Sequence, residues 1–201
     1  AQVSSEVLGI NAAIGMKDSP EIHLKDIMRV GQGCVDPALA RILAYESPKR
    51  LMELKEWGVP FKEDGGKLSQ VKFTGNSYPR ACHVFNRTGL EIVNTLKKLI
   101  EGEAHIYEHI RIVSLICIEN TVKGAVGLNT KTLEKITITA KATVLASGGA
   151  GQLYALNVNN FDVNGDGYVL GFDAGASLVN MEFIQFGPGV VWPKVKAIIH
   201  G

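Results

Sequence analysis

Apolar residues recur every three or four positions through much of the N-terminal half, which is the spacing of amphipathic helices. One such pattern covers 21–33 and ends in glycine, a common residue just after a helix. Two further patterns each follow a pair that is typical of a helix start, Asp36-Pro37 and Ser47-Pro48. We therefore expect three consecutive helices in this stretch. The expected buried face of the second consists of Leu39, Ile42, Leu43 and Tyr45.

The segment 60–86 has no regular pattern, and its glycines and prolines predict a loop. After it, Thr88 and Glu91 have the spacing of a capping box, in which each side chain bonds the backbone N–H of the other residue. A fourth helix is therefore expected from Thr88. Its apolar face comprises Ile92, Leu96, Leu99 and Ile100.

Beyond Gly102 the pattern changes to short apolar runs and alternation, which predict β-strands. The middle three form an expected meander, with turns at Asn120 and at 130–132. A last, buried strand is expected because its β-branched and aliphatic run stops at a cluster of small residues. A helix should follow from about Gly165 to Ala176. The strand candidates are 106–108, 111–119, 122–129, 133–140 and 142–146.

This order of elements predicts an α/β (α+β) fold with a mixed sheet. Residues 1–103 are expected to be mainly helical, 104–149 to hold the β-meander and the buried strand, and 150–201 to hold a glycine-rich acidic loop and a helix. The opening unit of many nucleotide-binding folds, a strand followed by G-x-G-x-x-G and a helix, does not occur near the start.

Composition narrows the choice of function. The net charge is +1 and no basic run stands out, so nucleic acid is not an expected partner. The 22 glycines exceed the average usage of roughly 7% and gather in turns, as expected where backbone approaches a ligand. Cys34, Cys82 and Cys117 are widely spaced, so neither a disulfide framework nor a zinc site is expected.

Two stretches carry candidate chemistry. The glycine-rich exit 146–151 allows a cofactor to lie against main chain, although a tight strand exit without a ligand explains it equally well. The segment Asp162–Asp173 has three interpretations: an EF-hand-like calcium loop, a cofactor loop in which Asp166 accepts hydrogen bonds from a ribose or flavin group, or a plain helix cap. Arg80 either clamps a carboxylate or pairs structurally, and structural pairing is favoured.

Several short motifs converge on one family. Together they resemble the flavoprotein subunit family of fumarate reductase and succinate dehydrogenase, which includes L-aspartate oxidase. The motifs, in chain order, are Gly9-Ile-Asn-Ala-Ala13, Asp18-Ser19 with His23 and Asp26, Glu46-Ser-Pro48, Trp57-Gly-Val-Pro-Phe61, Arg80 with Thr88-Gly89, Ala146-Ser-Gly-Gly-Ala-Gly151, Gly165-Asp-Gly167, Ala174-Gly-Ala176 and Met181-Glu-Phe183.

The resemblance implies part of a Rossmann-like FAD/NAD(P)-binding domain, without the family's N-terminal βαβ unit and capping domain. The chain then resembles an internal fragment, inactive alone, of an oxidoreductase that transfers hydride between flavin N5 and a carboxylate-bearing substrate such as a dicarboxylate. The implied partners are the remainder of the same flavoprotein and an iron–sulfur electron-transfer subunit. The implied location is cytoplasmic, peripheral to the inner face of the membrane.

The resemblance also assigns FAD contacts. Gln2 stands where membrane-bound members carry the histidine that bonds covalently to FAD, so the flavin is expected to be non-covalent. Gly187 replaces a substrate-binding histidine, which leaves open a non-catalytic remnant of the family. No residue here is assigned as acid or base. The implied FAD-contacting residues are Val3, Ser4, Ser5, Leu8, Gly9, Ile110, Arg111, Ile112, Ala146, Ser147, Gly148, Gly149 and Asp166.

Overall fold

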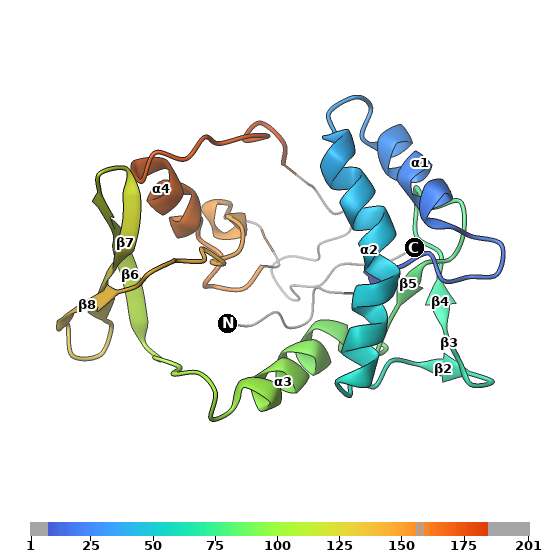
Figure 1. Cartoon of the computed structure of the whole chain (residues 1–201), viewed down its shortest axis with the longest axis horizontal. Coiled ribbons are helices and arrows are strands. Elements are labelled where there is room, and N and C mark those ends of the chain that lie inside the picture. The colour runs from blue at the N-terminus through green and yellow to red at the C-terminus, as the bar shows by residue number, and fades with distance from the viewer. Residues whose placement is uncertain (1–7, 156, 158, 185–201) are drawn as a thin grey trace. The chain divides into compact units, whose positions relative to one another are not determined.

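The computed structural model (Figure 1) describes residues 8–155, 157 and 159–184. The chain divides into two compact units, unit 1 at Ala1–Ala104 and unit 2 at His105–Gly201. The elements of unit 1 are β1 Ile10–Asn11, α1 Pro20–Val30, α2 Pro37–Glu56, β2 Glu63–Asp64, β3 Lys67–Leu68, β4 Gln70–Val71, β5 Ala81–Cys82 and α3 Thr88–Ile100. Those of unit 2 are β6 Ile110–Ile118, β7 Thr121–Asn129, β8 Lys135–Thr139, the 3₁₀ turn η1 Gly151–Leu153 and α4 Asp166–Asp173.

Helix α1 confirms the first helical pattern. Ser19 is its N-cap, with an extended backbone and an Oγ that accepts a hydrogen bond from the Ile22 N–H at 3.3 Å. Pro20 follows in the first turn, where its missing N–H has no helical partner to lose. At the other end the Gly31 N–H bonds the carbonyl of Ile27. The predicted end in glycine is therefore correct.

Helix α2 is one helix where the sequence predicted two. Asp36 caps its start by accepting from two backbone N–H groups, and Pro48 lies inside it. A proline inside a helix leaves the carbonyl four residues earlier without its donor. Here that carbonyl belongs to Ala44, and the Ser47 hydroxyl donates to it at 3.4 Å. The pair that suggested a new start thus belongs to a continuous helix.

The buried face of α2 also differs from the prediction. It consists of Ala40, Ala44, Ser47 and Leu51, whereas Leu39, Ile42 and Leu43 are 58–65% exposed. Helices α1 and α2 pack against each other and appear side by side in Figure 1. Leu51 of the buried face belongs to the core of unit 1.

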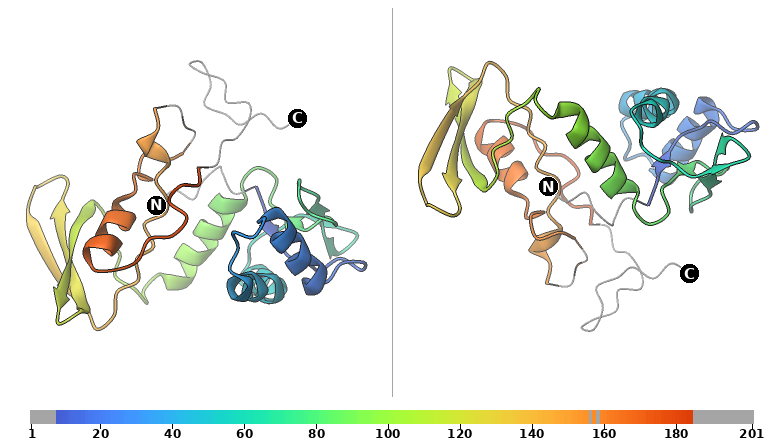
Figure 2. Two further views of the ribbon diagram at one scale, coloured as in Figure 1. Left: turned by 90° about the horizontal axis from the view of Figure 1, so that it is seen from above. Right: turned by 90° about the horizontal axis from the view of Figure 1, so that it is seen from below.

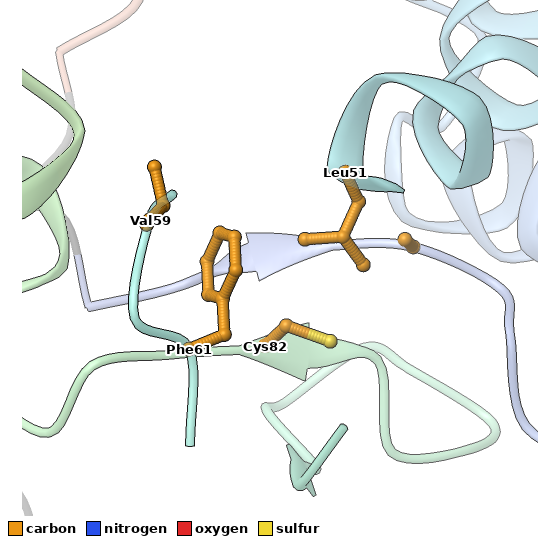
Figure 3. Close-up of a cluster of buried hydrophobic side chains, with 5 residues drawn as sticks. Leu51, Val59, Phe61 and Cys82 are labelled. Atoms are coloured by element: carbon orange, nitrogen blue, oxygen red, sulfur yellow. The ribbon is translucent and has the colours of Figure 1, made fainter. Parts of the chain in front are cut away.

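Short antiparallel strands replace the predicted loop at 60–86. Strand β5 pairs with β1 on one side and β4 on the other, and β2 pairs with β3. Two-residue strands are too short to produce a sequence period, which explains why the sequence did not predict them. The core of unit 1 lies between this sheet and α2. Figure 3 shows its members Leu51, Val59, Phe61 and Cys82.

The N-terminus of α3 does not have the predicted capping box. Arg87 occupies the N-cap position and makes no side-chain capping bond. Glu91 instead pairs with Arg87 at 2.8 Å, one turn apart on the helix surface. Thr88 is fully buried and bonds groups outside the helix. The helix itself is confirmed, because its apolar period continues to Ile100.

In unit 2, β6, β7 and β8 form the predicted antiparallel meander. Glu119 and Asn120 connect β6 to β7 with positive φ angles of 48° and 60°, as a tight two-residue hairpin requires. Helix α4 packs against β6, and the two further views in Figure 2 agree on this placement. The expected helix near 165–176 is thus present, although it is shorter.

Two predicted strands are wrong. Residues 106–108 precede β6 without strand structure, and 142–146 form no strand either. Val144, expected to be buried, is 89% exposed. A strand needs a hydrogen-bonded neighbour, and among the described residues none pairs with this run. The residue types of 142–146 are typical of a strand, but a strand forms only where another segment of the chain pairs with it.

We expect Leu51→Ala to lower the free energy of unfolding by about 2–5 kcal/mol, because it leaves a cavity at a fully buried position. Leu39→Ala on the same helix is the matched control, and its cost should stay below about 0.5 kcal/mol because Leu39 is 65% exposed. Urea unfolding followed by circular dichroism measures both. Equal losses for the two variants would contradict the assignment of the core.

Candidate functional site

A buried guanidinium organises unit 1. Arg80 is fully buried and donates to Asp18 through Nε at 2.7 Å and Nη2 at 2.8 Å. Its Nη1 donates to Asp26 at 2.7 Å. The fork of one arginine is thereby shared between two buried carboxylates, one before α1 and one within it. The structural interpretation of Arg80 fits this geometry, because its donors are engaged inside the fold.

Asp26 is the most densely bonded carboxylate of this cluster. Besides Arg80, it accepts hydrogen bonds from the Ser77 N–H and Oγ, each at 2.7 Å, and from Arg29 at 2.9 Å. Burial alone would raise the pKa of Asp26, but these hydrogen bonds hold the pKa well below its usual value. The sequence singled out Asp26 only as part of a motif. The sequence did contain one signal: Asp26 lies within an apolar helical pattern, and a carboxylate buried there needs a cationic partner.

An apolar cavity of about 860 Å³ lies next to this cluster and is lined largely by α1 and α2. His23 borders it, is buried, and has an Nδ1 without a partner among the described residues. Burial lowers the pKa of His23, and the charge of Arg80 lowers it further against the opposite effect of both aspartates. The imidazole is therefore neutral near pH 7. The apolar wall comprises Ile27, Val30, Ile42, Leu43, Leu51 and Leu54.

In unit 2, three of the predicted FAD-contacting segments come together. Arg111 on β6 pairs with Asp166 at the start of α4, with Nη2 3.0 Å from Oδ2. The Gly165 N–H donates to the Gly149 carbonyl at 3.1 Å. Gly165 has φ 85°, a left-handed conformation that glycine adopts without strain, and this turn brings the two segments together. Sequence alone did not predict the pairing between Arg111 and Asp166.

The remaining predicted contacts are distributed unevenly. Ala146, Ser147 and Gly148 are exposed, and Ile110 and Ile112 are half-buried on β6. Leu8 and Gly9 belong to unit 1, whereas the other described contacts belong to unit 2. Val3, Ser4 and Ser5 lie outside the described residues, as do Gln2 and Gly187.

The calcium alternative for Asp162–Asp173 does not fit. Residues from Asp166 to Asp173 form helix α4, so the first and last carboxylates of the helix are separated by about 10 Å along its axis. A calcium ion needs its oxygen ligands at roughly 2.3–2.6 Å. No group of three potential His, Cys, Asp or Glu ligands gathers anywhere in the part of the chain that the structure describes. Gly165 occupies the N-cap position of α4 and no side chain caps the helix, so the cofactor-loop interpretation is left.

The model of the FAD binding domain family matches residues 4–200. The chain belongs to this family. A fumarate reductase (CoM/CoB) polypeptide of Methanothermobacter marburgensis is 39% identical over 194 residues, with 94% of this chain and 36% of the relative covered. Chloroplastic L-aspartate oxidase of Arabidopsis thaliana is 34% identical over 187 residues, with 90% and 29% covered.

A solved structure of this FAD-binding family, Mycobacterium smegmatis Sdh1 in complex with UQ1, matches with a TM-score of 0.91 and 36% identity. The match covers 99% of this chain and 37% of that one. The chain thus spans about a third of the length of these relatives. These findings confirm the resemblance to fumarate reductase and succinate dehydrogenase flavoproteins, the mixed fold and FAD as the cofactor. None of the described helices is long and apolar enough to cross a membrane.

We expect Asp26→Asn to destabilise unit 1 by about 3 kcal/mol near neutral pH, because it removes one charge that compensates buried Arg80. Since the pKa of Asp26 is lower in the folded than in the unfolded chain, its contribution is present above about pH 4 and is lost as pH falls further. The variant should therefore lose stability less steeply in acid. Urea unfolding at a series of pH values measures this slope.

Glu46→Gln is the control for that series. Glu46 pairs with Arg50 on the surface of α2, and its side chain is 50% exposed. Its loss should cost less than about 1 kcal/mol and leave the acid slope nearly unchanged. If Asp26→Asn behaved like Glu46→Gln, the ion cluster around Arg80 would not carry the stability assigned to it.

Proposed function

We propose that this chain is the central part of an FAD-dependent oxidoreductase of the fumarate reductase and succinate dehydrogenase type. The carrying observation is the convergence of Arg111, Asp166 and the glycine-rich segment in unit 2. Family membership identifies FAD as the cofactor. This cluster is a place where the adenosine part of FAD can bind.

The carboxylate of Asp166 fits a hydroxyl-bearing ligand. A carboxylate has about four acceptor sites, and Arg111 Nη2 donates one hydrogen bond to Oδ1 at 3.1 Å while it lies 3.0 Å from Oδ2. The Asp166 side chain remains 37% exposed, so acceptor sites stay open to a ribose hydroxyl. Asp166 also lies in the first turn of α4, where the helix N-terminus attracts negative charge.

The segment 144–149 fits a flat ligand group. Its small residues expose main chain, and Gly148 has φ 79° with open space where a side chain would stand. Among the described residues, the N–H groups of 144–148 make no backbone hydrogen bond. Unpaired N–H groups beside an open glycine can bind the edge of a ring or a phosphate oxygen. This segment and Asp166 together form the proposed adenosine site.

Bound FAD supplies hydride transfer at its N5, and we propose a carboxylate-bearing substrate, such as a dicarboxylate, on the other side of that exchange. The residues of this chain bind and orient the cofactor. We propose non-covalent binding because an amide, as in Gln2, is a poor nucleophile. Proposed partners are the remainder of the flavoprotein and an iron–sulfur protein, and the proposed location is peripheral to the inner face of the membrane.

Asp166→Ala should raise the Kd for FAD about tenfold, because it removes a charged hydrogen-bond acceptor from the adenosine site. Asp173→Ala, at the exposed other end of α4, should leave the Kd unchanged. Flavin fluorescence titration of the apo-protein, in the longest polypeptide that carries these residues, gives both values. An unchanged Kd for Asp166→Ala would remove Asp166 from the proposed site.

Residues 1–201 alone should bind FAD weakly or not at all, because the opening phosphate-binding motif does not occur in this sequence. A longer polypeptide that contains them should be yellow, release its flavin on denaturation, and lose its colour when a dicarboxylate substrate or reductant is added. Visible spectroscopy of both preparations makes the comparison. A tight stoichiometric complex of 1–201 would contradict the expectation, and flavin binding without substrate-dependent bleaching would favour a non-catalytic remnant.

A further inference from the structure

Thr88 is a buried polar residue whose hydroxyl serves groups outside its own helix. It stands at the first position of α3, and its side chain is fully buried. The helix N-cap is Arg87, so Thr88 is not needed as the cap. A buried hydroxyl without hydrogen bonds would be costly, and its two bonds therefore identify its role.

The Thr88 hydroxyl connects two segments that are distant in sequence. Its Oγ1 accepts a hydrogen bond from the Val84 N–H at 3.0 Å and donates one to the Leu8 carbonyl at 3.2 Å. Leu8 is separated from Thr88 by 80 positions. One side chain thereby fixes the loop between β5 and α3 to the residue just before Gly9.

The Leu8–Gly9 peptide is held from a second direction by β5. A Cβ on Gly9 would lie 2.9 Å from the Cys82 carbonyl oxygen and 3.1 Å from the Ala81 Cβ. Ile10 then pairs with Cys82 in the antiparallel ladder. The main chain at Leu8 and Gly9 is thus confined between β5 and the Thr88 hydroxyl, and it has little freedom to shift.

The loop that precedes α3 adopts a conformation that presents the Val84 N–H to Thr88. Phe85 has φ 48°, an unfavourable value for a residue with a side chain, and its ring is 69% exposed. The Arg87 N–H closes the turn onto the Val84 carbonyl at 2.8 Å. The Phe85 ring lies edge-on to His83, with centroids 6.1 Å apart, and 5.8 Å from Lys62 Nζ, so these contacts and the hydrogen bonds of the turn together hold the strained backbone.

We propose that Thr88 is a positioning residue for FAD binding: it fixes the Leu8 carbonyl, and with it the backbone of Leu8 and Gly9. The inference rests on the proposed function, together with the expectation from the family resemblance that Leu8 and Gly9 contact FAD. Thr88 itself touches no cofactor in this scheme. It acts through the backbone that it holds.

Two variants separate the hydroxyl from the shape of the side chain. Thr88→Val keeps the volume and removes both hydrogen bonds, and it should raise the Kd for FAD about tenfold. Thr88→Ser keeps the hydroxyl and should stay within about twofold of the wild type. Both are measured by flavin fluorescence titration in the longest polypeptide that carries these residues, together with the visible spectrum of the bound flavin, which a purely structural role would leave unaltered.

Hydrogen exchange of the wild-type protein gives a test that does not depend on the folding of a variant. If Thr88 couples the backbone at Leu8 and Gly9 to the loop before α3, addition of FAD should slow amide exchange at Gly9 and at Val84 together, because one hydroxyl holds both segments. Slower exchange at Gly9 with no change at Val84 would overturn the proposal.

The outcomes separate this inference from the function on which it rests. If the longest wild-type polypeptide that carries these residues takes up no FAD, both are overturned. A wild-type protein that binds FAD, with Thr88→Val binding equally well, overturns the positioning role and leaves the proposed function intact. Loss of affinity in Thr88→Val with recovery in Thr88→Ser supports both.

Discussion

The ion cluster of Arg80 with Asp18 and Asp26 is the constraint on which unit 1 depends. A buried guanidinium is tolerated only if its charge and its donors are matched, and two carboxylates from the region of α1 match them. The same carboxylates fix α1 to the loop before β5. Helix α2 and the short strands then close the apolar core beside this cluster. Removal of one member of such a cluster is costly, because it leaves an uncompensated buried charge.

Unit 2 has a different construction. Its meander is built from neighbouring strands, and its one ion pair among the described residues is the surface pair between Arg111 and Asp166. This pair lies beside the exposed main chain of 144–149, and both belong to the proposed adenosine site. The two units therefore differ in construction: unit 1 is held by a buried ionic centre, whereas unit 2 presents an open surface that suits a ligand.

The sequence predicted those elements whose signals are local. The capping residue Asp36, the end of α1 at Gly31 and the turn at Asn120 stand where the residue types indicated. Prediction failed where the local structure depends on contacts that the local sequence pattern does not show. Pro48 looked like a helix start because the Ser47 hydroxyl that replaces the missing donor has no sequence signature. Residues 142–146 have strand composition, but pairing requires a neighbour that local sequence does not specify.

For the site, the motifs identified segments but not their partners. Asp166 and the glycine-rich exit were expected to bind FAD, while the ion pair to Arg111 required knowledge of the packing of α4 on β6. Sequence assigned Thr88 to a capping box, because spacing cannot distinguish a cap from a bridge to Leu8.

The sequence separation of the ion cluster of Arg80, Asp18 and Asp26 has a kinetic consequence. Arg80 lies 62 and 54 positions from its two aspartates, so closing those loops precedes completion of the core. During synthesis, both carboxylates stay hydrated until Arg80 has left the ribosome, so this cluster forms only after most of unit 1 has emerged, whereas neighbouring strands of the unit 2 meander can pair as soon as they emerge.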